Sequence, residues 1–116
     1  MYGKNIYSLT FGDQRNQNKS KKENESGILF TGIHHGREPI TFLMNLNIIL
    51  KILYEIENNN QDFIELINTR NIHFIPLINV DGYEYNTNLF ANNGNTFDMS
   101  FSRKNRRIHN SINCKE

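Results

Sequence analysis

The segment His35-Gly36-Arg37-Glu38 is the part of the sequence whose residue types and spacing could do chemistry. It places an imidazole and a carboxylate three residues apart, and zinc accepts a His nitrogen and a Glu oxygen at about 2.0–2.2 Å. A short connector that leads into a helix can point both side chains at one spot. The alternative is a surface histidine followed by an acidic residue that favours the positive end of a helix. The pattern by itself leaves both interpretations open.

Apolar runs precede the segments that carry polar groups. Gly27 to Ile33 is almost continuously apolar, which is typical of a central strand covered on both faces. Asn71 to Ile78 is a second candidate for a buried strand, in which pairing should end near Pro76 because proline cannot donate a ladder hydrogen bond. Asn5 to Phe11 alternates apolar and polar residues and predicts a third strand with one buried face. Gly12 to Ser26 is polar and predicts a solvated loop, which joins the strand ending at Phe11 to the strand beginning at Gly27.

A long helix is predicted between the two apolar runs. Pro39 opens it, in keeping with the preference of proline for the first helical position. Apolar residues at a spacing of three and four predict its buried face: Phe42, Leu43, Leu46, Ile49, Leu50, Leu53 and Ile56. Asn45 is expected on the opposite, polar side. Asn58 to Asn60 stops the helix, and Asp62 to Leu66 could add a helical turn.

Strand, helix and strand in this order predict a βαβ unit with parallel strands and a right-handed crossover. Ligands in such sheets gather beyond the carboxyl ends of the strands. His34 to Glu38 and Asn79 to Tyr83 both lie at those ends. The second segment is expected to be structural, with a turn at Asp81-Gly82. The chain after Tyr83 is polar and is expected to be irregular, with a basic cluster from Arg103 to Arg107. The order of elements therefore predicts an α/β fold with a site where the two strands end.

Composition bounds the class of protein. The 116 residues suffice for one small domain or part of a larger one. The net charge of +1 gives no global field for nucleic acid or an anionic membrane. The single cysteine, Cys114, cannot form an internal disulfide. Polar residues interrupt the stretch from Ile40 to Ile56, so no membrane span is expected, and the first residues lack the apolar core of a secretory signal.

Three segments, in order, resemble motifs of the zinc metallocarboxypeptidases, the carboxypeptidase A-like family. Gly32 to Ile40 is similar to the family's first zinc-binding motif, in which a His, two residues and a Glu follow an apolar strand. Pro76 to Tyr83 resembles the segment Pro-x-x-Asn-Pro-Asp-Gly-Tyr/Phe, with Val80 in place of the second proline. Phe101 to Arg106 is similar to Trp-Arg-Lys-Asn/Thr-Arg, with Ser102 where an aromatic residue is common. Together with the compatible secondary structure between them, these ordered matches cover nearly the whole chain.

The resemblance implies a role for each matching residue. His35 and Glu38 would be two of three protein ligands of one zinc ion, in a site of two His and one Glu. Arg103 matches the arginine that binds substrate and stabilises the developing oxyanion, and Arg37 matches a motif arginine on the substrate-binding side. The implied activity is the release of C-terminal amino acids from peptides or proteins.

The resemblance also implies groups that lie downstream of the last matched segment in the family. These are a second zinc histidine, an Asn-Arg pair that binds the terminal carboxylate of the substrate, a tyrosine, and a glutamate that activates water. The expectation is therefore an incomplete mixed sheet with a crossover helix, in which residues 1–116 form the N-terminal part of a carboxypeptidase-like α/β/α catalytic domain. Without a third ligand and a general base, this part alone is expected to be inactive.

The remaining histidines are expected to have other roles. His34 has the wrong spacing to Glu38 for the zinc motif and is expected to be a neighbour of the site. His73 lies within an apolar run and is expected to be a core histidine with a hydrogen-bond partner. His109 lies in a polar tail and is expected on the surface.

Other functions stay open at this point. An aspartoacylase-like zinc amidohydrolase shares the fold and a similar His-Gly-x-Glu motif, although the segments around Asn79 and Arg103 favour the peptidase. A non-catalytic protein that binds partners through a remnant cleft is a further alternative. A nucleic-acid binder that uses Arg103 to Arg107 is disfavoured, because the cluster is short and no aromatic platform interleaves it. Localisation and oligomeric state do not follow from the sequence.

Overall fold

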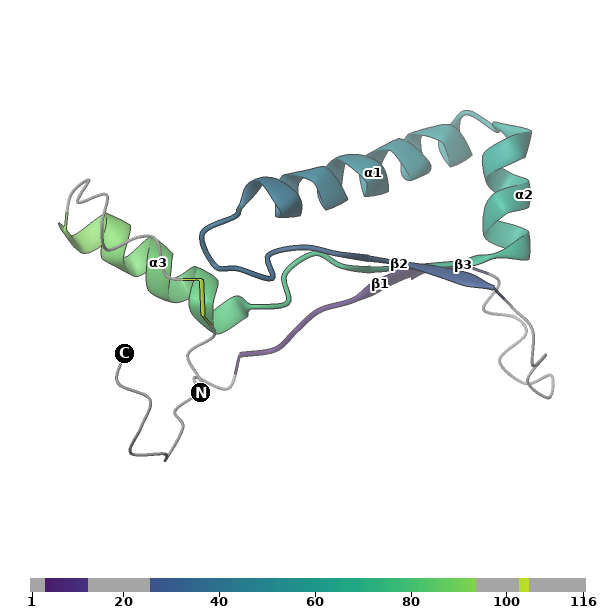
Figure 1. The fold of residues 1–116 in the computed structure, drawn as a ribbon. Helices are drawn as coiled ribbons and strands as arrows, with labels where there is room; N and C mark the ends of the chain where they lie inside the picture. Colours follow the sequence, from purple (N-terminus) through teal and green to yellow (C-terminus); the bar gives the residue numbers. More distant parts are fainter. Residues whose placement is uncertain (1–3, 13–25, 94–102, 105–116) are drawn as a thin grey trace.

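The computed structural model describes residues 4–12, 26–93 and 103–104 of the chain (Figure 1). In chain order, the elements within these ranges are β1 (Leu9–Phe11), β2 (Gly27–Thr31), α1 (Ile40–Glu57), α2 (Gln61–Thr69), β3 (Asn71–Ile75) and α3 (Val80–Asn93). Helix α1 runs along one face of the sheet, and α2 leads from its far end back to β3 (Figure 1). Helix α3 lies beyond the opposite end of the sheet.

The three strands follow the order β1-β3-β2, with β1 antiparallel and β2 parallel to β3. This mixed sheet, with two helices between its parallel strands, confirms the predicted α/β fold class and the βαβ unit. Strand β1 is shorter than the predicted Asn5 to Phe11, because only its last three residues pair with β3. Strand β3 ends at Ile75, directly before Pro76, as predicted.

Within the described residues, β2 is not the central strand covered on both faces that the apolar run predicts. Among the described strands β3 is central and β2 pairs on one side only. Leu29 of β2 is 58% exposed, on the face of the sheet opposite to the packed core. A run of apolar residues indicates that a strand meets apolar neighbours, but it does not say from which side they come.

The core lies between the sheet and helices α1 and α2. Phe74 of β3 is 0% exposed and lies at its centre. The ring of Phe74 stacks on that of Phe30 with centroids 5.0 Å apart, and it meets Phe11 edge-on at 6.0 Å. The other buried members of the cluster are Ile49, Ile52 and Ile72. One aromatic side chain from each strand therefore joins the sheet into one apolar surface, which α1 covers.

Helix α1 turns a different face to the sheet from the predicted one. Its buried residues are Asn45, Ile49 and Ile52. Three residues of the predicted buried face are exposed instead, namely Leu43, Leu50 and Leu53. Apolar residues nearly surround this helix, so their spacing fits more than one face. The amide NH₂ of Asn45 donates to the Thr41 carbonyl at 2.8 Å, whereas its Oδ1 is buried without a hydrogen-bond partner among the described residues.

The predicted stop at Asn58 to Asn60 is confirmed, because α1 ends at Glu57. Asn60 then begins α2, and its Oδ1 accepts a hydrogen bond from the Asp62 N–H at 3.1 Å. This cap satisfies a backbone donor that the first turn of a helix leaves unpaired. The predicted helical turn is part of the nine-residue helix α2.

The expectation of irregular chain after Tyr83 is wrong within the described residues, because α3 continues to Asn93. Its first turn contains Asp81, whose charge suits the positive end of a helix. The Oδ1 atom of Asn79 accepts from the Gly82 N–H at 3.0 Å, so this residue caps the helix. The segment that was expected to be a turn is thus the start of a helix.

None of the described helices is long and apolar enough to cross a membrane. Five features of the sequence lie outside the described residues: residues 13–25 of the predicted loop, the pair 101–102, the basic residues 105–107, His109 and Cys114.

Candidate metal centre

The segments that follow β2 and β3 run side by side beyond the ends of the strands. Gly32 N–H donates to the Ile75 carbonyl at 3.0 Å, and Ile78 N–H donates back to the Gly32 carbonyl at 3.1 Å. Asn79 N–H then donates to the Ile33 carbonyl at 3.0 Å. These bonds extend the parallel pairing and place the connector that follows β2 against the start of α3. The sequence predicts this meeting from the parallel strands.

The connector between β2 and α1 bends at Ile33, which is buried and has a φ of 45°. A β-branched residue in this region is strained by about 1–3 kcal/mol. Two bonds of one hydroxyl hold the bend, because Thr41 Oγ1 accepts from Ile33 N–H and donates to the Glu38 carbonyl, each at 2.8 Å. The first turn of α1 therefore fixes the connector that carries His35 and Glu38.

The side chains of His35 and Glu38 face each other across this connector. Nδ1 of the imidazole lies 3.0 Å from Oε1 and 2.9 Å from Oε2 of the carboxylate. The backbone closes the same turn, with Glu38 N–H donating to the His35 carbonyl at 3.1 Å. Both side chains are little more than one-third exposed, so a ligand can reach them from solvent. The predicted convergence of imidazole and carboxylate on one spot is present.

Arg103 reaches the other side of the same imidazole. Its Nη2 lies 3.3 Å from His35 Nε2, although the two residues are 68 positions apart. A guanidinium only donates hydrogen bonds, so Nε2 accepts here and the ring proton lies on Nδ1, where it is donated to Glu38. Arg103, His35 and Glu38 thus form one hydrogen-bonded row.

His35 and Glu38 have the donor types and the proximity that a zinc ion requires. One imidazole nitrogen and two carboxylate oxygens meet within 3.0 Å. Catalytic zinc sites use three protein ligands, and within the part of the chain that the structure describes no three His, Cys, Asp or Glu side chains come together. The pair therefore fits part of such a site, and its role as ligands stays a prediction.

Two glycines pack against each other where the connector meets α3. A Cβ atom on Gly36 would lie 2.4 Å from the carbonyl carbon and oxygen of Gly82. A Cβ atom on Gly82 would lie 2.6 Å from the side-chain amide of Asn79. These distances are far shorter than a van der Waals contact, so neither position accepts a side chain without movement of its neighbours. The glycines of His-Gly-x-Glu and Asp-Gly thus allow the two segments to interlock.

Comparison with known proteins agrees with the motifs. The model of the zinc carboxypeptidase family matches residues 1–115. The chain belongs to the zinc carboxypeptidase family. It is similar to a zinc carboxypeptidase of Saccharothrix mutabilis subsp. capreolus, with 36% identity over 83 residues, which are 72% of this chain and 18% of that protein. It is also similar to the carboxypeptidase N catalytic chain of Homo sapiens, with 30% identity over 82 residues, which are 71% of this chain and 17% of that one.

A solved structure shares the fold. The crystal structure of thrombin activatable fibrinolysis inhibitor superposes with a TM-score of 0.57 at 20% identity, covering 94% of this chain and 23% of that one. The chain thus spans less than a fifth of the length of these curated zinc carboxypeptidases. Family membership also favours the peptidase over the aspartoacylase-like amidohydrolase that shares the His-Gly-x-Glu motif.

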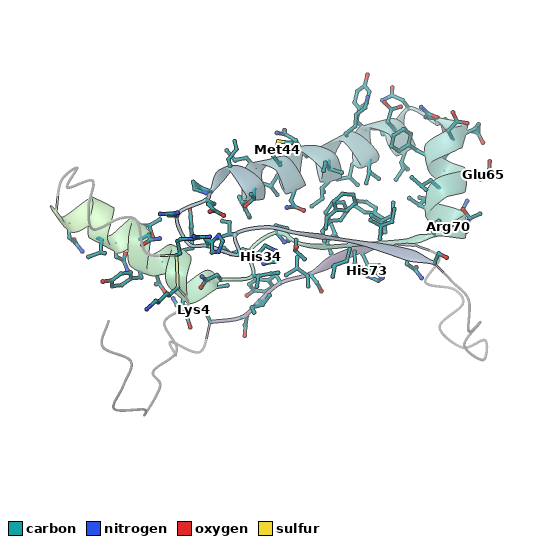
Figure 2. All side chains as sticks on the ribbon, in the orientation of Figure 1. Lys4, His34, Met44, Glu65, Arg70 and His73 are labelled. Carbon is teal, nitrogen blue, oxygen red and sulfur yellow. The ribbon has the colours of Figure 1, made fainter. Side chains whose placement is uncertain are left out.

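Two further histidines lie within the described residues of this zinc carboxypeptidase chain, His34 next to the candidate ligand His35 and His73 on β3 (Figure 2). His34 is a neighbour of the site, as predicted, because it precedes His35 in the chain. Its Nε2 bonds to Thr31 Oγ1 at 2.8 Å. The expectation that His73 is a core histidine is wrong, because it is exposed on the face of the sheet away from α1. Its Nδ1 bonds to Thr10 Oγ1 at 2.9 Å, the residue opposite it on β1. In a strand, alternate residues face opposite sides, and His73 lies between the buried Ile72 and Phe74.

Sequence reasoning gave the segment around Asn79 only a structural role and missed how many groups its side chain contacts. Its Nδ2 donates to the His34 carbonyl at 3.1 Å and lies 3.5 Å from the Arg103 carbonyl. The motif contained the residue, but no local pattern indicates a contact with a residue 24 positions later. Arg37, which was expected on the substrate-binding side, lies half-buried in the turn between the candidate ligands.

Proposed function

We propose that this chain forms the part of a metallocarboxypeptidase active site that holds zinc through His35 and Glu38. In the whole protein, the site would hydrolyse the last peptide bond and release C-terminal amino acids. The observation that carries the proposal is the row of Arg103, His35 and Glu38, in which an imidazole nitrogen faces both carboxylate oxygens. Membership of the zinc carboxypeptidase family supports the metal and the class of substrate.

The chemistry of the imidazole links the ligands to Arg103. His35 and Glu38 would hold a zinc ion, which would polarise the scissile carbonyl and activate a water molecule. Nδ1 of His35 is the ring nitrogen that faces the Glu38 carboxylate, and Nε2 faces Arg103. The guanidinium of Arg103 would bind the substrate and stabilise the developing oxyanion.

Two further assignments belong to the same proposal. Arg37, between the candidate ligands, would contact the substrate. Residues 1–116 would constitute part of a catalytic domain and would have no peptidase activity alone, because two ligands hold zinc less well than three and the proposal assigns no general base to them.

Calorimetric titration of the full 116-residue chain with a zinc salt tests the ligand assignment. We expect His35→Ala and Glu38→Ala each to weaken zinc binding by about tenfold or more, which corresponds to about 1.4 kcal/mol or more. His34→Ala is the matched control, because it removes an exposed imidazole next to the site that bonds to Thr31 instead. The control should bind zinc as the parent chain does.

The outcomes separate the candidate functions. Equal losses in His34→Ala and His35→Ala would indicate adventitious surface binding and contradict the site. No zinc binding by the parent chain would contradict it as well and favour a non-catalytic binding protein. Release of free C-terminal amino acids from a peptide by the 116 residues with zinc would overturn the assignment of inactivity while supporting the enzyme class.

A further inference from the structure

Asn79 lies where three segments of the chain meet. Its side chain is buried, at 7% exposure, between the connector after β2, the first turn of α3 and Arg103. Its Oδ1 accepts from Gly82 N–H at 3.0 Å, and its Nδ2 lies 3.1 Å from the His34 carbonyl and 3.5 Å from the Arg103 carbonyl. The carbonyl of one neighbour of His35 and that of Arg103 are therefore bridged by one NH₂ group.

The amide of asparagine suits this place for a chemical reason. Its NH₂ group has two donors, one for each main-chain carbonyl, and its oxygen is an acceptor for the helix cap. A buried donor or acceptor without a partner destabilises the fold, because it has lost its hydrogen bonds to water. Serine and aspartate would both keep the cap, because both are good residues at this position. Neither can donate to the two carbonyls together.

We infer that Asn79 is a positioning residue, which anchors the main chain of Arg103 so that the guanidinium meets His35. The anchor and the side chain act on opposite ends of the same residue, since Asn79 bonds to the Arg103 carbonyl and His35 Nε2 accepts from Arg103 Nη2. The backbone of the connector is held by the same amide through His34. Asn79 thus fixes the distance between the main chain of the connector at His34 and the main chain at Arg103.

The importance of this anchor for catalysis rests on the proposed function, in which Arg103 acts on the substrate. The anchor itself can be measured without metal or peptide, by the ring-nitrogen chemical shifts of His35 in the NMR spectrum of the 116-residue chain. We expect Arg103→Ala to move the Nε2 signal, because Nε2 then accepts only from water. Asn79→Asp and Asn79→Ser should move it by the same amount, and Arg103→Ala added to either should cause no further change.

Asn45→Ser is the matched control. Asn45 is also a buried asparagine, at 5% exposure, but its amide donates within α1 to the Thr41 carbonyl. The control should lower stability and leave the Nε2 signal in place. The inference is overturned if the Asn79 variants also leave that signal in place, or if their effect adds to that of Arg103→Ala.

A second measurement does not depend on whether the Asn79 variants fold. In the parent chain and in Arg103→Ala, which keeps the main-chain carbonyl, both Nδ2 protons of Asn79 should exchange slowly with solvent. Fast exchange of either proton in the parent chain would overturn the anchor. If the parent chain shows slow exchange at Asn79 but does not bind zinc, the proposed function is contradicted and the anchor is not.

Discussion

The middle of the sheet and its end at His35 are held together in different ways. In the middle, Phe74 is fully buried and touches one aromatic ring on each neighbouring strand. At the end, the apolar side chain of Ile33 is buried as well, and hydrogen bonds from Thr41 and Asn79 fix the connector and Arg103. Apolar burial is non-directional and tolerates small shifts, whereas hydrogen bonds specify positions. The core therefore supplies stability, and the polar end supplies geometry.

The largest effect is expected from the core. Phe74→Ala removes the ring that joins all three strands and should lower the free energy of unfolding by about 3–5 kcal/mol. Because small domains are only marginally stable, most of this chain should then be unfolded. The measurement is urea unfolding followed by far-UV circular dichroism.

Leu50→Ala is the control for this change. Leu50 is exposed on the outer side of α1, as is Met44 in Figure 2, and its loss should alter stability little. A cost for Leu50→Ala as large as that for Phe74→Ala would show that the outer side of α1 is packed as well. The core described here would then be only one of two.

A smaller but more local effect is expected where the two glycines meet. The Cβ atom of Gly36→Ala would lie 2.4 Å from main-chain atoms of Gly82, which cannot rotate away. We expect a cost of about 1–3 kcal/mol and displacement of His35, seen as a changed ring-nitrogen signal. Gly12→Ala is the matched control, because its Cβ would meet the far end of the Asn71 side chain at 2.2 Å, and a side chain can move. A displaced His35 signal in the control, or none in Gly36→Ala, would contradict the interlock.

Much of the fold follows from local patterns in the sequence. Apolar runs bounded by polar residues identified β2 and β3, and the run from Asn58 to Asn60 marked the end of α1. The face of α1 did not follow, because its apolar residues nearly surround it and only the position of the sheet decides between faces. Helix α3 was missed because Asp81-Gly82 is a typical turn pattern. In the structure, the side chain of Asn79 instead caps a helix that begins there.

The candidate site divides in the same way. His35 and Glu38 are close in the sequence and in space, so their spacing predicts their contact. Arg103 was found through resemblance to a family motif, since no spacing rule connects residues that far apart. The contacts of Asn79 depend on the packing of three segments, and only the structure shows them.

The smallest effect is expected at the corner between α1 and α2, where the polar contacts are more exposed to solvent than those of Asn79. The carboxylate of Glu55 binds Lys51 with one oxygen and Asn60 Nδ2 with the other, at 2.7 Å for the latter. The hydrogen bonds from Lys51 and then from Asn60 lower the pKa of Glu55, and the bond to Glu55 raises the pKa of Lys51.

These two shifts make the stability of the fold depend on pH. The lowered pKa of Glu55 stabilises the fold above the pKa that Glu55 has in the unfolded chain, and this gain disappears as the pH falls through its folded-state pKa. The raised pKa of Lys51 acts at high pH, because the stability that it contributes is lost as the pH rises through the folded-state pKa of Lys51.

Glu55→Gln should therefore reduce stability slightly at neutral pH, by less than Gly36→Ala does, and the difference from the parent chain should shrink in acid. Urea unfolding at a series of pH values measures it, with the exposed Glu57→Gln in the same helix as the control. Because Lys51 is exposed to solvent, water and salt screen its attraction to Glu55. Added salt should weaken this corner while leaving the buried contacts of Asn79 unchanged. If Glu55→Gln lowers the free energy of unfolding by more than Gly36→Ala does, the strength of the polar contacts in this chain does not follow from how well they are buried.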